Sequence, residues 1–397
     1  MPEMTLKILA DENIPQLDKW FVPLGEVRKI AGRDLTTEQI GDADVLLVRS
    51  VTAVNEQLLA NSCVRFVGTA TIGTDHLDTA WLDAQTIRWA SAPGSNATSV
   101  VEYVLAALCE VDDVLERLLT GGVVGIVGGG NVGSRLCRRL QVLGITVQVY
   151  DPFLSASSGL PLVSWAQILA ADVLCLHTPL TDSGAFPTRH LFNQQILEQL
   201  KPQTLLLNAG RGAVIDNAAL LQWLNAEKQH RAVLDVWENE PAINRELFNC
   251  VALGTPHIAG YSLDGKNSGS RQLYDSLIDW LQNKSSNEIL SQSKIAQYEN
   301  QQNHNEQKIA LDLSGFDTSN KAQFIRQIMR VVYPICDDHK RLADVMQITD
   351  EFERRKGFDR LRREYPVRRE IAAYRIANGQ SLSAATREVL LVMGFHV

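Results

Sequence analysis

Residues 123–133 read Val123-Val124-Gly125-Ile126-Val127-Gly128-Gly129-Gly130-Asn131-Val132-Gly133. The apolar run predicts a buried strand, and the pattern G-x-G-x-x-G, formed by Gly128, Gly130 and Gly133, follows it directly. Glycines at this spacing permit a tight turn, close approach of a pyrophosphate to the backbone, and close packing of a helix on the strand. The amides of Asn131 and Val132, at the start of the expected helix, would face the anionic charge. On this pattern alone, an ordinary glycine-rich turn remains the alternative.

An acidic residue at the end of the next strand strengthens the dinucleotide interpretation. Asp151 follows the expected strand Thr146–Tyr150 and lies 23 residues after Gly128. A carboxylate at this place accepts hydrogen bonds from ribose hydroxyls and repels a 2′-phosphate. Pro152 and Phe153 supply no basic side chain that could hold such a phosphate. The sequence therefore favours NAD over NADP.

Short apolar runs alternate with helical stretches on both sides of the glycine loop, which predicts parallel sheets covered on both faces. In the N-terminal block the expected strands are Lys7–Ala10, Val27–Ile30, Val45–Val48, Arg65–Gly68 and Ile87–Ala90. A long helix is expected from about Asn96 to Leu119. In the second block the expected strands are Val123–Val127, Thr146–Tyr150, Asp172–Leu176, Thr204–Leu207, Val233–Val236 and Val251–Leu253, with a helix over Asn131–Leu143.

The C-terminal part differs in character. Residues 284–307 are rich in Ser, Asn and Gln and predict a linker. Beyond them we expect a strand at Lys308–Leu313, a helix at Lys321–Tyr333, a strand at Arg369–Ile376 and a helix at Ser383–Val392. The predicted fold class is thus α/β, with two doubly wound parallel-sheet domains and a small C-terminal α+β domain. The expected domains are residues 1–93 with 258–285 for substrate, 94–257 for the nucleotide, and 286–397.

Composition narrows the classes of function. The chain has 397 residues, 45% of them hydrophobic and 21% charged, which is ordinary globular usage, and its net charge of −8 argues against a nucleic-acid partner. No apolar run approaches the length of a membrane span, and no basic, signal-like segment begins the chain. Seven arginines lie between residues 354 and 369, but interleaved acidic residues favour a solvated, salt-bridged surface over a nucleic-acid site.

The six cysteines are scattered singly, without CxxC or a Cys/His ligand spacing. We therefore expect no metal site, and buried free thiols in a reducing compartment. Together with the absence of a signal-like segment, this predicts a cytoplasmic protein.

Three further segments stand at the ends of expected strands of the second block. They are Asn208-Ala209-Gly210-Arg211-Gly212, Asp235-Val236-Trp237-Glu238-Asn239-Glu240-Pro241 and Thr255-Pro256-His257-Ile258-Ala259-Gly260-Tyr261. Taken singly, Arg211 could be a surface cation, Glu240 a turn residue and His257 a loop histidine. Their order behind a dinucleotide-binding turn makes a shared site the better interpretation.

With these segments, His177-Thr178-Pro179-Leu180 and the glycine loop, the sequence resembles the D-isomer-specific 2-hydroxyacid dehydrogenases over roughly residues 5–285. The resemblance implies that Arg211 holds the substrate's carboxylate and carbonyl oxygen, His257 exchanges the hydroxyl proton, and Glu240 acts on His257. It also implies that Thr178 and Asp235 lie on the nicotinamide side of NAD. Ala209, Gly210, Arg211 and Gly260 would touch the cofactor, and the C-terminal domain would form a homodimer.

The chemistry requires these residue types. Moving a hydride from carbon 2 leaves a developing carbonyl, so a base must take the hydroxyl proton, and histidine titrates near neutral pH. A neighbouring carboxylate orients the ring and stabilises its protonated form. The planar guanidinium of Arg211 can fix a carboxylate, and with it the face of carbon 2 that meets the cofactor.

Within the family, the N-terminal segments around Arg49-Ser50 and Thr69–Asp78, together with Tyr261–Lys266 and the extra C-terminal domain, are similar to a member that acts on a phosphorylated 2-hydroxy acid. Ser50, Thr71 and Tyr261 match its substrate positions. Arg49 is a candidate phosphate ligand, and an ion pair within its own domain is equally compatible with the sequence.

Two positions depart from the family pattern, and two other functions remain open. Asn239 stands where glycine is expected, and Gly210 where cysteine or serine is expected. The alternatives are another acid of the family, such as 3-phosphoglycerate or glycerate, and an NAD-sensing interaction protein without turnover. The presence of Arg211, Glu240 and His257 argues against the second.

Overall fold

The computed structural model describes residues 6–33, 35–283 and 308–397, and the expected linker at 284–307 lies outside them. Backbone packing divides the chain into two compact units, residues 1–96 with 262–307 and residues 97–261 with 308–397. The divisions at 96/97 and 261/262 lie close to the expected ones at 93/94 and 257/258. Residues 308–397 belong to the same unit as the second sheet, so their existence as an independent third domain stays a prediction.

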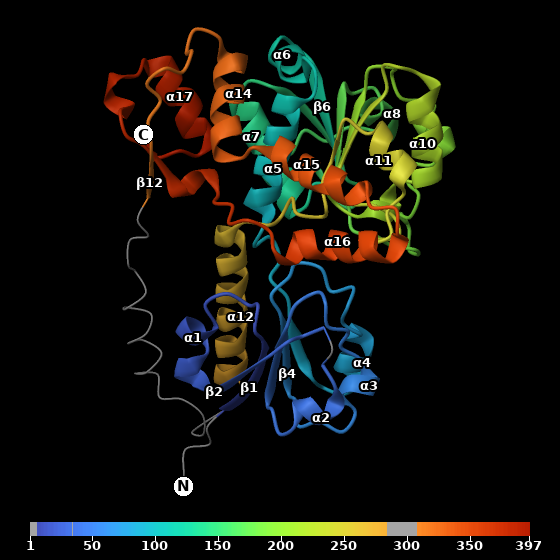
Figure 1. The fold of residues 1–397 in the computed structure, drawn as a ribbon, viewed down its shortest axis with the longest axis vertical. Helices are drawn as coiled ribbons and strands as arrows, with labels where there is room; N and C mark the ends of the chain where they lie inside the picture. Colours follow the sequence, from blue (N-terminus) through green and yellow to red (C-terminus); the bar gives the residue numbers. More distant parts are fainter. Residues whose placement is uncertain (1–5, 34, 284–307) are drawn as a thin grey trace. The chain divides into compact units, whose positions relative to one another are not determined.

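The first unit is built on a parallel five-stranded sheet with the order β2-β1-β3-β4-β5 (Figure 1). Its strands are β1 (Leu6–Asp11), β2 (Gly25–Ile30), β3 (Val45–Val48), β4 (Phe66–Thr69) and β5 (Arg88–Ala90). Its helices are α1 (Leu17–Trp20), η1 (Val22–Leu24), α2 (Thr37–Ile40), α3 (Glu56–Leu59), α4 (Thr79–Ala84) and α12 (Leu263–Asn283). Leu273 and Leu277 of α12 are fully buried in one core of this sheet. The helix is therefore part of this unit although it follows the second sheet in sequence.

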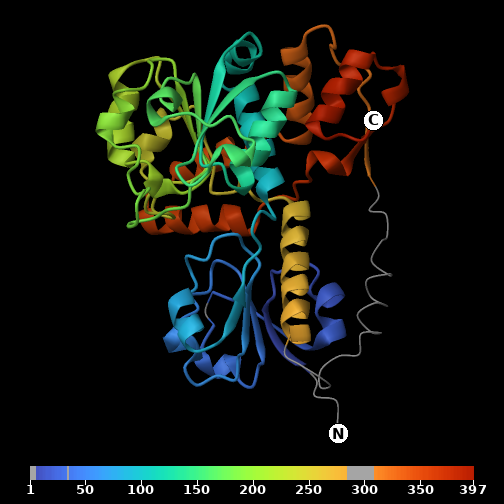
Figure 2. The ribbon, with the colours of Figure 1, turned by 180° about the vertical axis from the view of Figure 1, so that it is seen from behind.

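The second unit contains a parallel six-stranded sheet with the order β11-β10-β9-β8-β6-β7. Figure 2 shows its green strands among helices of the same unit. Its strands are β6 (Val123–Val127), β7 (Thr146–Tyr150), β8 (Val173–Leu176), β9 (Leu205–Asn208), β10 (Arg231–Leu234) and β11 (Leu253–Gly254). Its helices up to residue 261 are α5 (Ala97–Glu110), α6 (Val114–Leu119), α7 (Asn131–Val142), η2 (Ala156–Ser158), α8 (Trp165–Ile168), α9 (Gln194–Leu197), η3 (Gly212–Val214), α10 (Asn217–Ala226) and α11 (Arg245–Cys250). The two expected doubly wound sheets are confirmed.

Alternate residues of the second sheet face two separate cores, as expected for strands covered on both sides. Ile126 and Leu207 pack towards α5, α7 and the C-terminal helix α14 (Lys321–Val332). Leu174 and Leu206 pack towards α8–α11 and the C-terminal helices α15 (Ile335–Met346) and α16 (Glu351–Arg363). The order of the strands reverses at β6, because the chain goes from β6 to β7 on one side and then to β8 on the other. Ligands of open α/β sheets bind at such a switch point, beside the carboxyl ends of the strands.

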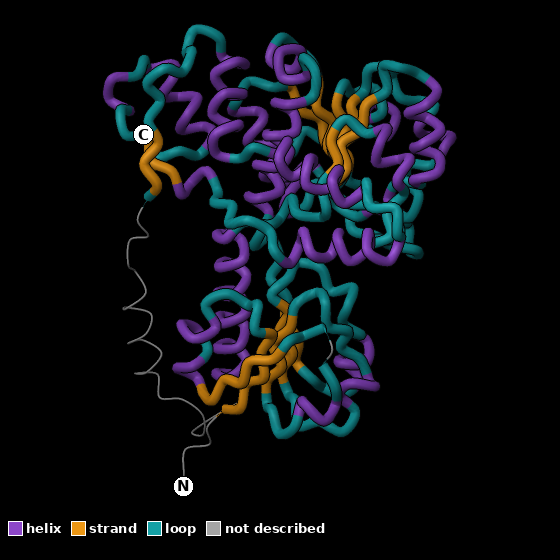
Figure 3. The backbone as a smooth tube through the Cα atoms, viewed as in Figure 1, coloured by secondary structure: helices purple, strands orange, loops and turns teal. Residues whose placement is uncertain are grey.

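The C-terminal residues form a two-stranded parallel pair and several helices (Figure 3). These elements are β12 (Ile309–Leu311), α14 (Lys321–Val332), α15 (Ile335–Met346), α16 (Glu351–Arg363), η4 (Ile371–Ala373), β13 (Tyr374–Ile376), η5 (Gly379–Ser381) and α17 (Ala384–Met393). The sequence did not lead us to expect α15 and α16.

Three sequence expectations are wrong in detail. The long helix from Asn96 to Leu119 is broken between α5 and α6, where Asp112 takes a left-handed conformation with φ 42°. The strand expected to begin at Arg369 begins at Tyr374, because residues 371–373 form a 3-10 turn. Cys63 and Cys336 are exposed rather than buried, since Cys63 lies in a loop after α3 and Cys336 in the first turn of α15.

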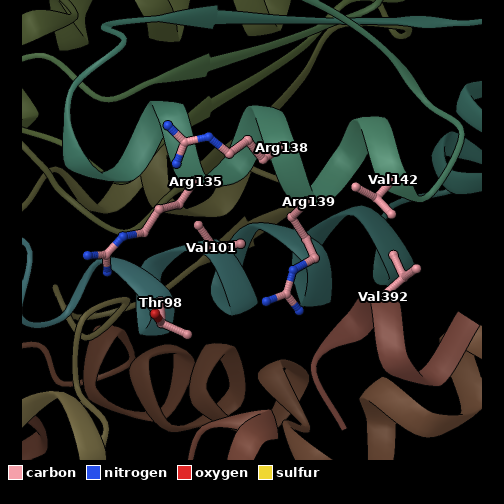
Figure 4. Close-up of a pocket in the computed structure, with 7 residues that line it drawn as sticks. All are labelled: Thr98, Val101, Arg135, Arg138, Arg139, Val142 and Val392. Atoms are coloured by element: carbon pink, nitrogen blue, oxygen red, sulfur yellow. The ribbon is translucent and has the colours of Figure 1, made fainter. Parts of the chain in front are cut away.

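Where α17 packs beside α5 and α7, a cavity of about 250 Å³ remains. Figure 4 shows that Arg135, Arg138 and Arg139 reach it from α7, while Thr98 and Val101 come from α5. Within the described ranges, no helix is long and apolar enough to cross a membrane. No cluster of three metal-binding side chains occurs among the same residues.

Candidate active site

The turn after β6 has the geometry that the glycine pattern requires. Gly128 has φ +97°, and a Cβ atom placed on it would lie 2.8 Å from the carbonyl oxygen of His177. A Cβ on Gly133 would lie 1.9 Å from the carbonyl oxygen of Gly128, so only glycine lets α7 pack so closely on the turn. Gly130 is the N-cap of α7, and a Cβ on it would meet no atom within 4 Å. The backbone is therefore open on the side where the first amides of α7, at Asn131 and Val132, are unpaired within the helix.

Asp151 lies beside this turn. Its carboxylate accepts hydrogen bonds from the amide of Gly129 at 2.9 Å and from the amide of Phe153 at 3.0 Å. A carboxylate has about four acceptor positions, so each oxygen keeps one for a ribose hydroxyl. The next residues, Pro152 and Phe153, carry no positive charge, and Phe153 is 76% exposed. The segment after Asp151 therefore supplies no basic side chain that could bind a 2′-phosphate.

Two polar atoms after β8 are buried without a hydrogen-bond partner in the described part of the chain, the Oγ1 of Thr178 and the Nε2 of His177. Burial lowers the pKa of His177 to about 4, so this imidazole is neutral at physiological pH. Buried polar atoms usually have partners, so a site beside the glycine turn that contains two unpaired ones fits a polar ligand. The glycine cradle and these atoms together fit NAD.

Arg211 follows β9 in a loop held by Asn208. The Nδ2 of Asn208 donates to the carbonyl of Arg211 at 3.0 Å, and its Oδ1 accepts from the amide of Gly210 at 3.0 Å. A Cβ on Gly210 would lie 3.1 Å from the carbonyl oxygen of Leu176 and 3.2 Å from that of Thr178. Glycine therefore stands here in place of the expected cysteine or serine, and it allows the Ala209–Arg211 loop to pack closely on the end of β8.

The Arg211 loop also lies against the loop after β10. A Cβ on Gly212 would lie 2.0 Å from the carbonyl oxygen of Trp237, so glycine is required for this approach. In the second loop, Glu240 accepts a hydrogen bond from the amide of Trp237 at 2.8 Å. Asn239 has φ +60°, a left-handed conformation that asparagine adopts more readily than other residues with side chains. This explains how asparagine replaces the expected glycine without removing Glu240 from its place.

His257 and Glu240 form the central pair of the site. The Nδ1 of His257 lies 2.7 Å from the Oε2 of Glu240. Burial acts to raise the pKa of Glu240, but the nearby His257, the Trp237 amide and Arg362 outweigh it and lower the pKa below its usual value. Glu240 is therefore ionised at neutral pH. Since a carboxylate only accepts, Nδ1 carries the proton of this hydrogen bond and Nε2 is the basic nitrogen.

Asp235 holds the loop that carries His257. Its Oδ1 accepts hydrogen bonds from the Oγ1 of Thr255 at 2.6 Å and the amide of Ile258 at 2.8 Å, and its Oδ2 accepts from the amide of Ala259 at 2.9 Å. His257 itself has φ +58°, a conformation that costs about 1–3 kcal/mol and persists where the surroundings enforce it. Asp235 thus fixes the histidine's backbone, and Oδ2 keeps an acceptor position for the expected nicotinamide contact.

Gly260 and Tyr261 end this loop, in a turn closed by a hydrogen bond from the Tyr261 amide to the carbonyl of Ile258 at 2.8 Å. Tyr261 is half-buried. The structure thus brings Arg211, Glu240, His257, Asp235 and Tyr261 onto loops at the carboxyl ends of β9, β10 and β11.

Ser50 and Thr71 belong to the first unit and follow the neighbouring strands β3 and β4. Ser50 is exposed. The Oγ1 of Thr71 donates to the carbonyl of Gly73 at 3.1 Å and lies 2.7 Å from the Oγ1 of Thr69. Arg49, beside Ser50, makes no ion pair among the described residues, which removes support for the alternative of a salt bridge within its domain.

Comparison with known proteins identifies the family. Residues 107–259 match the NAD binding domain of the D-isomer specific 2-hydroxyacid dehydrogenases, and residues 292–390 match a domain of unknown function. The chain is 45% identical over 396 residues to erythronate-4-phosphate dehydrogenase of Cellvibrio japonicus, covering 98% of this chain and 100% of that one. The chain belongs to the erythronate-4-phosphate dehydrogenases.

A second member of the erythronate-4-phosphate dehydrogenases, from Teredinibacter turnerae, is 42% identical over 94% of this chain and 96% of its own length. The NAD-bound 3-phosphoglycerate dehydrogenase of Entamoeba histolytica is similar in fold, with a TM-score of 0.61 at 21% identity over 72% of this chain and 99% of that one. The family's NAD-binding domain is therefore present here, and its fold is that of the 2-hydroxyacid dehydrogenases.

Sequence reasoning missed several residues that support the site. Asn208 and Thr255 lie within three residues of Arg211 and His257 in the sequence. This proximity could have indicated that they support the site. Arg362, which contributes to the charge around Glu240, gives no such signal because it lies more than a hundred residues away. The expectation of a fully solvated arginine surface is wrong for Arg368, which is 6% exposed, and for Arg362, whose Nε is buried.

Proposed function

We propose that this protein oxidises 4-phospho-D-erythronate to 2-oxo-3-hydroxy-4-phosphobutanoate with NAD, a step in the formation of pyridoxal phosphate. The observation that carries the proposal is the His257–Glu240 pair, 2.7 Å apart on loops beside Arg211, in a chain 45% identical to a curated erythronate-4-phosphate dehydrogenase over its whole length. Bound NAD supplies the acceptor for the hydride that leaves carbon 2.

His257 acts as the general base in this proposal. Its Nε2 takes the proton of the carbon-2 hydroxyl as the carbonyl forms, while Glu240 stabilises the imidazolium that results. The proton then passes from His257 to solvent, so the reaction yields the oxo acid, the reduced cofactor and one proton. Glu240 also fixes the direction of Nε2, because both its oxygens are held, one by the Trp237 amide and one by the ring.

Arg211 holds the carboxylate and the oxygen on carbon 2, which orients the carbon–hydrogen bond that breaks. Thr178, Asp235, Ala209, Gly210 and Gly260 surround the cofactor's nicotinamide half, and Gly128, Gly130, Asn131, Val132 and Asp151 surround its adenosine and pyrophosphate half. Ser50, Thr71 and Tyr261 bind the remaining substrate groups. Residues 1–93 with 258–285 form the substrate domain and 94–257 the cofactor domain.

We further infer a cytoplasmic homodimer that associates through residues 286–397. Large apolar side chains of this segment support the dimer, because Val331, Phe352, Val367 and Leu391 are each at least half exposed. Sedimentation velocity of the full chain tests it, and a monomer at micromolar concentration would contradict it.

A substrate panel tests the proposed activity. Purified protein with NAD is offered 4-phospho-D-erythronate, D-glycerate, D-lactate and 3-phospho-D-glycerate, and formation of NADH is followed by fluorescence. The proposal expects the highest kcat/KM for 4-phospho-D-erythronate. A higher value for 3-phosphoglycerate or glycerate would favour another acid of the family, and absence of turnover with all four would favour a sensing protein.

A further inference from the structure

A segment near the C-terminus lies against the loop that carries His257. The ring of Tyr365 meets the ring of Tyr261 edge-on, with centroids 5.9 Å apart and an interplanar angle of 83°. Arg368 donates through Nη2 to the carbonyl of Ala259 at 2.6 Å and to that of Ser99 at 3.2 Å. The guanidinium carbon of Arg362, in the last turn of α16, lies 5.9 Å from the centre of the Tyr261 ring. Residues 362–368 therefore form one wall beside the expected substrate residue Tyr261.

Arg362 differs from the other arginines of this region in its partners. Arg363 and Arg355 are largely exposed and pair with Glu364 and Glu351. Arg368 donates through Nη2 to two backbone carbonyls and lies 4.2 Å from the centre of the Tyr333 ring, away from Tyr261, although its Nε and Nη1 are also buried without an acceptor among the described residues. Arg362 has no ion pair in the part of the chain that the structure describes, and its Nε is buried there without a hydrogen-bond acceptor.

The acidic groups near Arg362 have other hydrogen-bond donors, and no hydrogen bond or ion pair joins them to Arg362 in the described part of the chain. Burial acts to lower the pKa of Arg362, but Tyr261, Glu240 and Asp235 outweigh it and raise the pKa. Both oxygens of Glu240 accept hydrogen bonds from Trp237 and His257, and Asp235 accepts three from the His257 loop. The guanidinium thus keeps donors, the buried Nε among them, that no carboxylate of the described residues accepts. A buried donor without an acceptor costs about 1–3 kcal/mol, more when it is charged, so the place favours an anionic ligand.

We propose that Arg362 binds the phosphate end of the substrate. This inference rests on the proposed function, in which Arg211 takes the carboxylate at the other end of the same molecule. A guanidinium presents a planar fork of donors that matches the oxygens of a phosphate, and the Tyr261 hydroxyl beside it adds a further donor. The C-terminal segment would then select a phosphorylated acid over an unphosphorylated one, in addition to any role in dimerisation.

Steady-state kinetics with a matched pair of substrates tests the proposal. The variants Arg362→Gln and Arg362→Lys are compared with wild type on 4-phospho-D-erythronate and on D-erythronate, which lacks only the phosphate. Arg360→Gln is the control, because Arg360 is an exposed residue of the same helix for which no side-chain contact is found among the described residues. NAD affinity and Tm report whether each variant is folded.

In Arg362→Gln, kcat/KM for the phosphorylated acid should fall about 10- to 100-fold, chiefly through KM, since a hydrogen bond to a charged group is lost. The kcat/KM for D-erythronate should change little, so the ratio of kcat/KM between the phosphorylated and the unphosphorylated acid should fall by the same factor. Arg362→Lys should retain part of this preference for the phosphorylated acid, because lysine keeps the positive charge but lacks the planar set of guanidinium donors. Arg360→Gln should match wild type.

An equal fall on both substrates, or a shifted pH profile of kcat/KM, would overturn the proposal and make Arg362 a positioning residue for Glu240. An unchanged preference in Arg362→Gln would overturn it as well and favour Arg49 as the phosphate ligand. The proposed function fails separately if the wild type does not reduce NAD with 4-phospho-D-erythronate. In that case calorimetric titration of the wild type and of Arg362→Gln with inorganic phosphate still tests the phosphate site. Loss of phosphate binding in Arg362→Gln supports the site, and retained binding overturns it.

Discussion

The two parallel sheets share a strand order, yet the turns after their first strands differ. The first sheet has the order β2-β1-β3-β4-β5, and the second has the order β7-β6-β8-β9-β10-β11, with one further strand at its end. Both sheets therefore have a switch point at their first strand in sequence. After β1, the side chain of Asp11 accepts from the amide of Asn13 at 2.8 Å, and the helix that follows has four residues. After β6 stand three glycines and a helix of twelve residues whose N-cap offers no side-chain cap.

The difference shows what topology contributes and what the loop contributes. Topology provides a crevice beside the carboxyl ends in both sheets. After β1, however, the Asp11 carboxylate accepts from the amide of Asn13, and the amides of Glu12 and Ile14 donate to backbone carbonyls. Only the second turn leaves amides of a long helix open to an anion. The second unit contains the family's NAD-binding domain, and we propose that the first unit, built on the same strand order, binds the substrate.

The largest effect should follow from removing the groups at the ends of β9 and β11. In His257→Ala, turnover should fall about 10²–10⁴-fold, because the proposed general base is lost, while NAD still binds. Arg211→Ala should lose about 10²-fold or more, since the substrate is no longer oriented. Turnover is measured by NADH formation and NAD affinity by fluorescence titration. A variant with near-normal turnover would take that residue out of the mechanism.

A substitution in the turn after β6 sharpens the contrast between the sheets. In Gly133→Ala the new Cβ would lie 1.9 Å from the carbonyl oxygen of Gly128, so the turn must move. Such overpacking costs about 1–3 kcal/mol, and we expect NAD affinity to fall about 10- to 100-fold. The matched control is Asn13→Ala in the turn after β1, which should leave NAD affinity unchanged. Equal effects of the two substitutions would contradict the assignment of the cofactor to the second sheet.

Asp151 should have a smaller effect on the cofactor. Asp151→Ala removes the acceptor for the ribose hydroxyls and also the partner of the Gly129 amide. NAD affinity should weaken about tenfold, and the preference for NAD over NADP should narrow, because the charge that repels a 2′-phosphate is gone. Dissociation constants for both cofactors check this. An unchanged preference would mean that Asp151 does not reach the ribose.

Much of the fold was predictable because the buried strands are continuous apolar runs, as in β3, β6 and β8. The position of Arg211, Glu240 and His257 at one edge of the sheet was predictable for the same reason, since each follows such a run by a few residues. Their roles were implied by the resemblance to the family and stay predictions. Asn239 looked like a departure in the sequence, and only the backbone shows that its left-handed conformation suits asparagine.

The C-terminal helices were harder to predict. Helix α16 is rich in charge and buries little beyond Gly357 and Phe358, so it has no apolar stripe of helical period. Its Arg362 reaches the site through tertiary packing, and nothing in the local sequence separates it from the solvated Arg360 and Arg363. The break at Asp112 was missed because the apolar pattern continues on both sides of it.

The pH dependence of the reaction in Glu240→Gln tests the central claim, that Glu240 and His257 act as one pair, most directly. Burial acts to raise the pKa of Glu240, but the neighbouring His257 outweighs it and lowers the pKa, so the carboxylate is charged throughout the neutral range. In the proposed mechanism oxidation delivers a proton to a base, so kcat/KM at saturating NAD should rise with pH in the wild type. Glutamine carries no charge at any pH and cannot stabilise the protonated base, and the rising limb should therefore move to lower pH. A limb that stays in place, or moves to higher pH, would contradict the coupling of Glu240 to the base.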